Sequence, residues 1–351
     1  MTSGNDKKSI HLVRILRLIL SLLLTGVFLY IAFYGVDFSE VINISSRASV
    51  LWVGVFILLQ YLSHFLRAFR WQIILKSVKP DTKLKNLFGA MMVGYGVNCV
   101  IPRLGEVTRA VLIGKWEGLS RSSMFGTVIV ERVIDIVFLC LTVMVSVLIW
   151  SGNLYESFPW LKSSLIITAV IMAAVIIILY LIIFLKEKFY NLIIRIIGLF
   201  SATAAQKSAH IFSLLTEGFA SLKGARNYLL TFGISVVMML VYALNAYVGF
   251  FTLGMENIKT VSFEMGWILM SISAIGVVIP TPGGTGSYHT LAKTALVVLF
   301  GFEETISLAY AFLTHIISYS IFILTALIVF FILNKQHENI FKVVDAKLEE
   351  T

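Results

Sequence analysis

The feature that most restricts the fold is a series of long apolar runs separated by short polar segments. A helix that crosses the hydrocarbon core of a membrane needs about 20 mostly apolar residues. Charged residues make up only 13% of this chain, about half of their share in soluble domains. The sequence therefore predicts an all-α polytopic membrane protein with little chain left for a soluble domain. About six full spanning helices are expected, at residues 17–36, 50–66, 124–150, 163–185, 228–252 and 305–333.

Cleavage, disulfide and nucleic-acid signals are weak. The first apolar run follows the basic residues Lys7 and Lys8 and lacks a small-x-small cleavage site, so we expect it to remain as the first helix. Cys99 and Cys140 lie far apart inside apolar runs and are predicted to be small buried hydrophobes. The net charge of +9 resides in short loops, where the positive-inside rule explains it without a nucleic-acid partner.

The distribution of Lys and Arg predicts the orientation. Residues 67–85 contain six basic residues and one acid, and residues 186–227 contain six basic residues and two acids. Short loops rich in Lys and Arg stay in the cytoplasm. The segments 37–49, 151–162 and 253–262 contain few basic residues and are predicted to lie outside. This orientation leaves both termini in the cytoplasm.

Two further apolar regions, 86–120 and 263–302, are interrupted. Charge parity requires each region to return to the side from which it entered, so we predict two re-entrant helical hairpins that enter from opposite faces. Each turns at a Pro-Gly break, "IPRLGE" at 101–106 and "IPTPGG" at 279–284. An arm such as 86–101 extends about 24 Å, less than the roughly 30 Å hydrocarbon core. Two complete spans per hairpin would satisfy the same parity.

The predicted elements form two units of the same plan and opposite orientation. The first membrane repeat covers residues 1–151, the second covers 152–334, and a cytoplasmic tail follows at 335–351. Inverted repeats of this kind occur in many transporters, with the binding site where broken helices meet. The sequence therefore favours a transporter-like inverted repeat.

The first break places Arg103, Glu106 and Arg109 around the start of a helical arm. Glu106 would stabilise a helix N-terminus there, and the arginines would extend to lipid headgroups. Alternatively, the helix N-terminus and the two arginines form an anion site for a phosphate. Charged groups within a membrane usually mark a site or pathway.

The segment "VERVIDIVF" places Glu131, Arg132 and Asp135 within about one turn of a predicted spanning helix. The three side chains could neutralise one another as a structural cluster. Alternatively, the carboxylates are counter-charges for Arg103 or Arg109 that give way when substrate binds. A proton relay is a further alternative.

The segment "HFLRAFRW" places His64, Arg67 and Trp71 on one helix face. Trp and Arg at a cytoplasmic helix end are commonly interface anchors. The alternative is a headgroup-entry portal formed by Arg67, Arg70 and Trp71.

The second break, "PTPGGTGSYHTLAK", lacks the strand and the Gly-Lys-Ser/Thr signature of a nucleotide loop. Glycine would permit a tight reversal. Alternatively, exposed backbone N–H groups and a titratable imidazole face a cavity. His315, in the last predicted span, is either a core residue or part of the site. The candidate residues of this break are Gly283, Gly284, Gly286, Ser287 and His289.

Signatures of catalysis are missing from the sequence. It contains no H-E-x-x-H motif, no nucleophile elbow and no Cys/His metal spacing. We therefore expect a protein that is not an enzyme and that uses no cofactor and no metal.

The motifs "RAFRW", "IPRLGEVTRA", "ERVID" and "PTPGGTG" occur in this order. Together they resemble the flippase-like transmembrane region of the lysylphosphatidylglycerol synthase family, over residues 12–335. The resemblance implies a protein that moves anionic or aminoacylated phospholipids, with relatives linked to polyprenyl-phosphate lipids of envelope glycan assembly. The motif positions correspond here to Arg67, Arg70, Trp71, Pro102, Gly105, Glu106, Arg109, Glu131, Arg132, Asp135, Pro282, Gly283, Gly284 and Gly286.

Two departures from the family pattern change what the resemblance implies. Full-length synthases carry an aminoacyl-transferase domain after the membrane part, whereas this chain stops at Thr351, so we do not expect synthase activity. The family often has a glutamate after the second Gly-rich turn, where this chain has Ser287-Tyr288-His289. The headgroup preference is therefore expected to differ.

The leading hypothesis is a lipid flippase of a bacterial cytoplasmic membrane that moves a phosphate-headgroup lipid. Arg103, Arg109 and the helix N-termini would bind the phosphate. Its partners would be membrane lipids with anionic headgroups and, as a further possibility, envelope-biogenesis enzymes. One alternative is an ion-coupled transporter of a small soluble anion. Another is a non-transporting membrane partner of an envelope enzyme.

Overall fold

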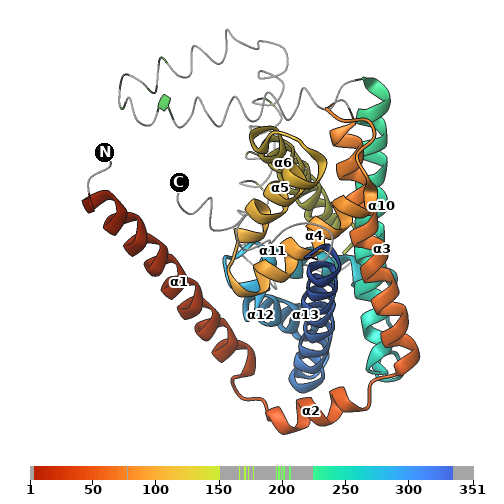
Figure 1. Cartoon of the computed structure of the whole chain (residues 1–351). Coiled ribbons are helices and arrows are strands. Elements are labelled where there is room, and N and C mark those ends of the chain that lie inside the picture. Colours follow the sequence, from red (N-terminus) through yellow and green to blue (C-terminus); the bar gives the residue numbers. More distant parts are fainter. Residues whose placement is uncertain are drawn as a thin grey trace. The chain divides into compact units, whose positions relative to one another are not determined.

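The computed structural model describes residues 4–76, 78–150 and 224–334, with a few single positions between 166 and 206. The regular secondary structure of these residues is helical, joined by turns and loops (Figure 1). The predicted span 163–185, the outside segment 151–162, nearly all of the basic segment 186–227 and the tail 335–351 lie outside the described residues.

Ten α-helices have described bounds. Three short helical segments accompany them: 3-10 turns at Met255–Asn257 and Pro282–Gly284, and a π-helical segment at Ala295–Leu299. The α-helices are α1 (Gly4–Phe33), α2 (Phe38–Ser46), α3 (Val50–Leu75), α4 (Leu84–Val100), α5 (Leu104–Glu117), α6 (Arg121–Ile149), α10 (Ala225–Thr252), α11 (Phe263–Val278), α12 (Ser287–Thr294) and α13 (Glu304–Asn334).

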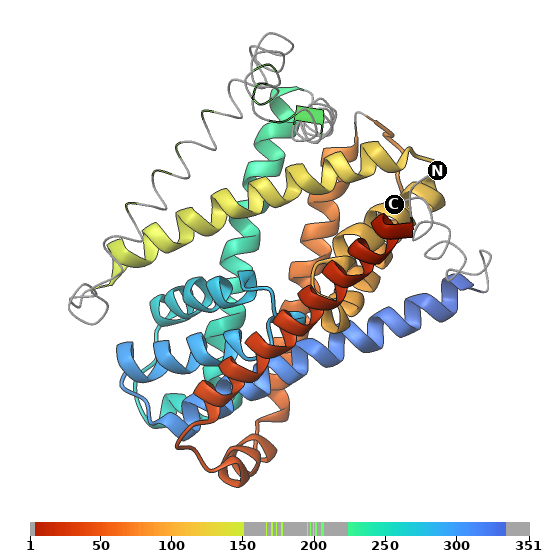
Figure 2. The ribbon, with the colours of Figure 1, turned by 90° about the vertical axis from the view of Figure 1, so that its left-hand side faces the viewer.

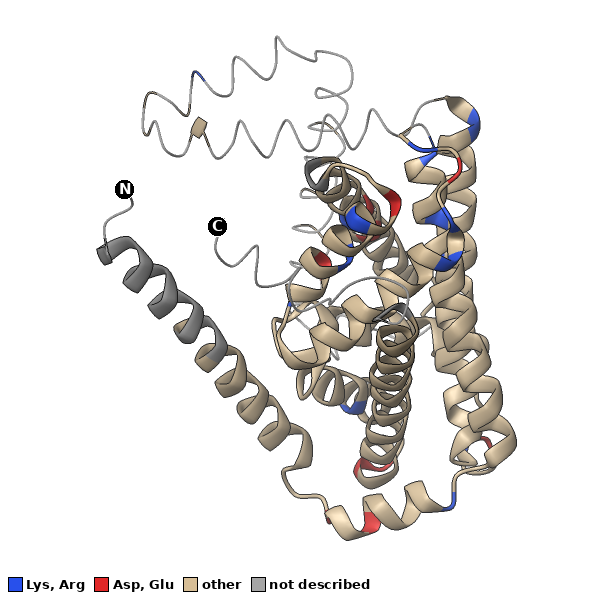
Figure 3. Cartoon of the chain, in the orientation of Figure 1, with Lys and Arg blue, Asp and Glu red and all other residues tan. Residues whose placement is uncertain are grey.

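Four described helices, α3, α6, α10 and α13, are long and apolar enough to cross a membrane. A fifth span is possible if α1 and α2, which are bent by 81° relative to each other, act as one. Figure 3 shows how few charged residues lie along these long helices. The prediction of an all-helical polytopic membrane protein is therefore confirmed, whereas the number of six spans stays a prediction.

Helix α3 is longer than predicted. The apolar run was expected to end near residue 66, with the chain in the cytoplasm from residue 67, but α3 continues to Leu75. The helix predicted from His64 to Trp71 is therefore present as part of α3. The extension is possible because acidic partners, described below, neutralise the two arginines inside the protein.

The two interrupted regions each contain two short helices. α4 has 17 residues and α5 has 14, and they are separated by residues 101–103. α11 has 16 residues and is separated from α12 by residues 279–286. Both interruptions lie where the Pro-Gly breaks were predicted. The re-entrant paths and the inverted repeat stay predictions.

The chain forms two compact units that are discontinuous in sequence. Among the described residues, the first, here called the turn unit, comprises residues 4–61, 92–105 and 242–334. The second, the arginine unit, comprises residues 62–91, 106–150 and 224–241. The predicted boundary between two repeats near residue 151 stays a prediction.

In the turn unit, α12 is the central element. It contacts α1, α11 and α13, and α13 also contacts α2 (Figures 1 and 2). Ala32, Val41 and Leu308 form a small buried core where α1, α2 and α13 meet. Lys293 at the end of α12 donates to the carbonyl of Ala32 at 3.0 Å and pairs with Glu304 at 2.8 Å. These contacts fix the second break against its neighbours.

In the arginine unit, Glu117 fixes the end of α5 to the loop before α4. Its buried carboxylate accepts hydrogen bonds from Lys79 Nζ at 2.9 Å, from Asn86 Nδ2 at 2.7 Å and from the N–H of Lys83 at 3.2 Å. Burial opposes ionisation of Glu117, but these donors outweigh it, so the pKa of Glu117 lies below its ordinary value. The loop and α5 are thereby held together.

Candidate functional site

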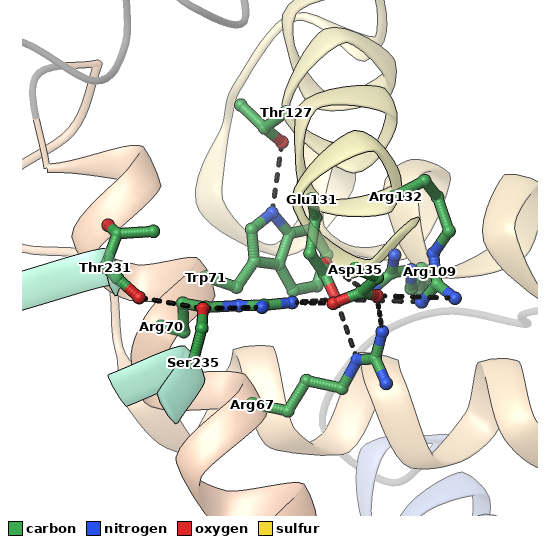
Figure 4. A network of polar contacts seen from close by, with 10 residues as sticks. All are labelled: Arg67, Arg70, Trp71, Arg109, Thr127, Glu131, Arg132, Asp135, Thr231 and Ser235. Carbon is green, nitrogen blue, oxygen red and sulfur yellow. Dashed lines mark hydrogen bonds and ion pairs between the residues drawn. The ribbon is translucent and has the colours of Figure 1, made fainter. Parts of the chain in front are cut away.

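Glu131, near the middle of α6, is the centre of a buried ionic network in the arginine unit (Figure 4). Its side chain is completely buried. One carboxylate oxygen accepts a hydrogen bond from Arg67 Nε at 2.8 Å, and the other accepts one from Arg109 Nη1 at 2.7 Å. Arg70 Nη2 lies 3.5 Å from the first oxygen. Three helices, α3, α5 and α6, therefore meet at this carboxylate.

Asp135, one turn after Glu131, is the second acceptor. Arg67 and Arg70 both donate to it through Nη2. Arg132 lies beside both acids, 3.6 Å from Glu131 and 3.7 Å from Asp135. We call these residues the arginine–carboxylate cluster; its members are Arg67, Arg70, Arg109, Glu131, Arg132 and Asp135.

Helical spacing explains how the cluster forms. Arg67 and Arg70 are separated by three residues on α3, and Glu131 and Asp135 by four on α6, so each pair shares a helix face. α5 contributes Arg109, which is also buried. Alone, α3 and α5 would present their arginines to an apolar medium without the acids of α6. The association of the three helices brings these charges together.

Trp71 and a serine on α10 make further contacts with the arginines of the cluster. The indole Nε1 of Trp71 donates to Thr127 Oγ1 at 3.0 Å, and the Arg109 guanidinium lies 4.9 Å from the centre of the Trp71 ring. A cation–π contact of this kind contributes about 2 kcal/mol when desolvated. Arg70 Nη1 donates to Ser235 Oγ at 3.0 Å. The sequence does not indicate Thr127 and Ser235, because no local pattern marks a hydroxyl that accepts a hydrogen bond from a helix far away in the chain.

The acids of the cluster lie well inside a candidate membrane span. Glu131 is eight residues inside the candidate span Ser123–Ile149, which corresponds to about 12 Å at 1.5 Å per residue. The hydrocarbon core is roughly 30 Å thick. Removing an ion from water costs several kcal/mol, so such groups persist only when they are paired and hydrogen-bonded. The multiple contacts of Glu131 and Asp135 meet this requirement for the acids.

The guanidinium groups are less completely matched. In the ion pairs of the described residues, four arginines share two carboxylates. The Nε atoms of Arg70 and Arg132 are buried and have no hydrogen-bond partner among the described residues. Exposure rises from 0% at Glu131 to 37% at the side chain of Arg132. The cluster is therefore closed at Glu131 and open at Arg132.

The predicted pairing of these carboxylates with Arg109 is present. Arg103 is not among the cluster's ion pairs; it is exposed, belongs to the turn unit and has a φ of 66°. Glu106 is half-buried in the first turn of α5. The interface-anchor alternative is wrong for Arg70 and Trp71, because both side chains are completely buried within the arginine unit. His64 is also buried.

The first break is held by its own backbone and one amide side chain. Asn98 Oδ1 accepts a hydrogen bond from the N–H of Gly105 at 2.7 Å. A Cβ atom on Gly105 would overlap the carbonyl oxygen of Gly94 on α4. Glycine is therefore required where the chain enters α5.

The second break is a tight reversal with φ values of 55°, 79° and 86° at Gly283, Gly284 and Gly286. The N–H of Gly286 donates to His289 Nδ1 at 3.2 Å, and the N–H of Gly284 donates to the Thr281 carbonyl at 3.1 Å. The expectation of exposed N–H groups is wrong for these two, because the turn uses them itself. His289 is buried and caps the start of α12.

Tyr319, on α13, joins the two breaks. Its hydroxyl lies 2.9 Å from the carbonyl oxygen of Cys99 and 3.0 Å from that of Pro282, and it accepts from Thr285 Oγ1 at 3.3 Å. Cys99 therefore lies in the polar surroundings of a break, although its side chain is buried, and Cys140 is half-buried. The sequence does not mark Tyr319, because its partners are backbone carbonyls far away in the chain.

His315 and Ser287 make further contacts around the second break. His315 stacks on Tyr288 with ring centres 5.4 Å apart, and its Nε2 lies 3.3 Å from Thr285 Oγ1. Ser287 Oγ donates to the Gly276 carbonyl at 2.7 Å, tying α12 to α11. The described residues contain no group of three or more His, Cys, Asp or Glu side chains arranged to hold a metal ion.

Comparison with known proteins gives partial relatives and a family. A UPF0104 membrane protein of Methanothermobacter thermautotrophicus is 27% identical over 139 residues, 38% of this chain and 40% of that protein. A UPF0104 membrane protein of Methanocaldococcus jannaschii is 30% identical over 118 residues, 32% of this chain and 34% of that protein. These matches span well under half of the relatives' length.

The family comparison covers far more of the chain. The sequence model of the family described as the lysylphosphatidylglycerol synthase transmembrane region matches residues 18–337. This range contains all four motifs on which the resemblance was predicted, and it includes the arginine–carboxylate cluster and both breaks. The resemblance is confirmed, and the chain belongs to the lysylphosphatidylglycerol synthase transmembrane-region family.

Proposed function

We propose that this protein translocates a lipid with a phosphate headgroup across a membrane, and that the arginine–carboxylate cluster binds the headgroup. The observation that carries the proposal is a pair of buried guanidinium donors, the Nε atoms of Arg70 and Arg132, that have no acceptor among the described residues. A buried donor without an acceptor costs about 1–3 kcal/mol. The oxygens of an anionic headgroup would accept hydrogen bonds from such donors.

The type of cation supports a phosphate. Guanidinium groups present planar, paired donors that match phosphate oxygens, and they remain charged in partly buried sites. Arg132 and Arg67 lie at the more accessible side of the cluster, where side-chain exposure is 37% and 12%. A headgroup arriving there would contact these two arginines first.

The surroundings support a lipid as the carrier of that phosphate. Phe65 and Phe69 on α3 and Ile136 on α6 are exposed apolar side chains close in sequence to the charged residues. A spanning helix with such residues faces hydrocarbon. The headgroup would then occupy the polar cluster while the tails stay in the bilayer, without covalent chemistry or a cofactor.

The proposal includes the architecture predicted from the sequence. Two re-entrant hairpins in an inverted repeat would open the site alternately to either side of a bacterial cytoplasmic membrane, with both termini in the cytoplasm. The short lengths of α4, α5 and α11 support this, since about 20 residues are needed for a complete span. The hairpin tips would meet near Tyr319.

One alternative transporter uses the same cluster. A small soluble anion, carried with a coupling ion, would also accept hydrogen bonds from the guanidinium donors, and the exposure of Arg132 favours access from water. A non-transporting membrane partner of an envelope enzyme would need no ligand at the cluster. The soluble-anion transporter would not move lipid but would need the cluster charges for transport. The non-transporting partner would need neither lipid movement nor the cluster charges.

The test is translocation of a fluorescent phosphate-headgroup lipid in proteoliposomes. Arg109→Ala is expected to abolish translocation, because it removes a guanidinium that contacts both Glu131 and Trp71. Arg226→Ala, at an exposed arginine near the start of α10, is the matched control and should remain active. Monodisperse elution and an unchanged melting temperature would establish folding. Full activity of a folded Arg109→Ala protein would overturn the proposal.

A further inference from the structure

Building on the proposed function, we infer that one proton travels with each headgroup and that His315 on α13 binds this proton. His315 belongs to the turn unit, whereas the arginine–carboxylate cluster belongs to the arginine unit. It is eleven residues inside the candidate span Glu304–Ile332, which corresponds to about 16 Å at 1.5 Å per residue. Ionisable side chains inside spanning helices usually mark ion or proton pathways. Imidazole is the side chain that gains and loses a proton near neutral pH.

The hydrogen bonds around the second break determine where neutral His315 carries its proton. The Thr285 hydroxyl donates to the Tyr319 hydroxyl at 3.3 Å, so Thr285 Oγ1 is the acceptor toward His315 Nε2, also at 3.3 Å. Nε2 therefore holds the proton of the neutral ring, and Nδ1 holds the lone pair. A proton from water can bind at Nδ1 on one side of the membrane and return to water on the other. The contact between Nε2 and Thr285 is kept in both forms.

His289 is the second imidazole of this region, with its ring centre 4.6 Å from that of His315. Its Nδ1 already accepts the N–H of Gly286 at 3.2 Å, so a proton there would set two donors against each other and break the cap of α12. Lys293, one turn later, places a further positive charge on the same helix, paired with Glu304. Two imidazolium rings this close would repel each other. The two rings therefore share one proton, and His315 holds it.

Aromatic rings around His315 stabilise its charged form. Burial opposes a charge, so a proton on His315 needs favourable neighbours. The ring centres of Tyr288 and Tyr319 lie 5.4 Å and 4.9 Å from that of His315, and aromatic rings within about 6 Å attract a cation. Charge also strengthens the hydrogen bond that Nε2 donates to Thr285. His315 is half-buried and His289 is buried, so His315 is the more accessible of the two.

Other titratable groups near α12 and α13 are uncharged near neutral pH or exposed. Behind Tyr319 lies Cys99 of α4, whose carbonyl contacts the Tyr319 hydroxyl. The exposed titratable residues on the neighbouring helices are Tyr30 of α1, Asp37 and Glu40 at the start of α2, and Glu264 of α11. The groups that face the imidazole of His315 directly are thus His289 and the two tyrosines.

Tyr319 connects the proton site to both breaks. Its hydroxyl accepts from Thr285 and lies 2.9 Å and 3.0 Å from the carbonyl oxygens of Cys99 and Pro282. Hydrogen bonds in series polarise one another, so a charged His315 strengthens this chain of contacts. The first break continues directly into α5, the helix that contributes Arg109 to the cluster. Proton binding therefore acts on the helix that holds part of the proposed headgroup site.

Charge favours movement of the proton in the same direction as the headgroup. A phosphodiester headgroup carries one negative charge, and moving it alone would work with or against the membrane potential. One proton on His315 cancels that charge, so the pair crosses without net charge transfer. The expected process is cotransport from the acidic to the alkaline side.

The test measures how a pH gradient distributes lipid between the two leaflets. Wild-type protein is reconstituted in liposomes with fluorescent phosphatidylglycerol, a phosphodiester, and the membrane potential is clamped. One proton per headgroup should shift the leaflet ratio by up to about tenfold for a gradient of one pH unit, toward the alkaline side. Chemical quenching from outside gives the share of probe in each leaflet, and empty liposomes with the same gradient are the baseline.

Two variants locate the proton. His315→Gln keeps an amide N–H that can donate to Thr285 but has no titratable nitrogen, so the probe should exchange between leaflets without responding to the gradient. His289→Asn keeps an acceptor for the N–H of Gly286, and its ratio should still shift. A response in a folded His315→Gln protein, or its loss in a folded His289→Asn protein, would overturn the assignment. If His315→Gln does not fold, the size and direction of the wild-type shift decide.

The wild-type results distinguish this inference from the proposed function. Exchange of the probe with the same leaflet ratio with and without the gradient would overturn proton coupling and leave lipid translocation intact. Accumulation on the acidic side would also overturn cotransport. Failure to exchange the probe under any condition would overturn the proposed function itself.

Discussion

The arginine–carboxylate cluster and the Gly-rich turn around Tyr319 show two different ways of placing polar groups in an apolar protein. In the cluster, guanidinium groups outnumber carboxylates, and two Nε donors have no acceptor among the described residues. Around the turn, the polar groups are uncharged and contact one another: Tyr319 with Cys99 and Pro282, and His289 with Gly286.

This difference distinguishes a candidate binding site, the cluster, from a turn whose polar groups hold helices together. A turn whose donors and acceptors satisfy each other gains little from a ligand, whereas a cluster with excess donors gains a great deal. Both regions contain motifs that the sequence marks as functional. We propose ligand binding for the charged region and geometric roles for the residues of the turn.

The largest effect is expected from Glu131→Gln, which removes the charge that Arg67, Arg70, Arg109 and Arg132 share. Breaking a buried ion pair on one side costs about 3–5 kcal/mol. The melting temperature of the purified protein in detergent should fall strongly, whereas Glu40→Gln, at an exposed glutamate of α2, should change little. If Glu131→Gln is as stable as wild type, the cluster does not depend on the shared charge of Glu131, and its contrast with the uncharged turn is wrong.

The second effect in size is expected from Gly283→Ala in the turn. Alanine at a φ of 55° costs about 1–2 kcal/mol, and its Cβ would also overlap the ring of Tyr319. Stability should fall while the headgroup preference stays that of the wild type. Gly26→Ala on α1, where a Cβ meets no atom within 4 Å, is the control. A changed headgroup preference would assign ligand binding to the turn.

A smaller loss is expected from Tyr319→Phe. The variant removes one hydroxyl that lies within hydrogen-bonding distance of the carbonyls of Cys99 and Pro282. Since a single proton serves both, the loss should be about 1 kcal/mol. Chemical unfolding of the variant can be compared with that of Tyr34→Phe, at an exposed tyrosine. If Tyr319→Phe is as stable as wild type, Tyr319 does not join the breaks.

The smallest effect should be a pH dependence at Glu117, outside the spanning helices. Because the pKa of Glu117 is lowered in the folded protein, its stabilising contribution is present above the ordinary value of about 4.3 and is lost as the pH falls through the folded pKa. Melting temperatures measured from neutral to acidic pH should therefore converge between wild type and Glu117→Gln. A constant difference at all pH values would contradict this assignment.

Local patterns predicted the four long apolar helices that the structure describes and the two breaks, but not the short helix α2. Apolar length indicates a span, and Pro102, Gly105, Pro282 and Gly283 mark interruptions because their backbone preferences are intrinsic. The pairing of Arg109 with the α6 carboxylates was predictable as one of two alternatives, since a buried arginine needs an acid.

Long-range partners could not be predicted. α3 extends to Leu75 because Glu131 and Asp135, more than sixty positions away, neutralise its arginines. Tyr319 binds backbone carbonyls, which every residue possesses, so no sequence pattern indicates its partners. The capping role of His289 depends on the φ of Gly286, which the sequence permits but does not specify.

The most direct test of the central claim is mass spectrometry of lipids that co-purify with the protein. If the cluster binds a phosphate headgroup, anionic phosphate lipids should be enriched in the wild-type preparation relative to the host membrane. The enrichment should be lost in Arg132→Gln and retained in Arg226→Gln. A wild-type lipid composition identical to that of the host membrane, or equal enrichment in both variants, would contradict the claim.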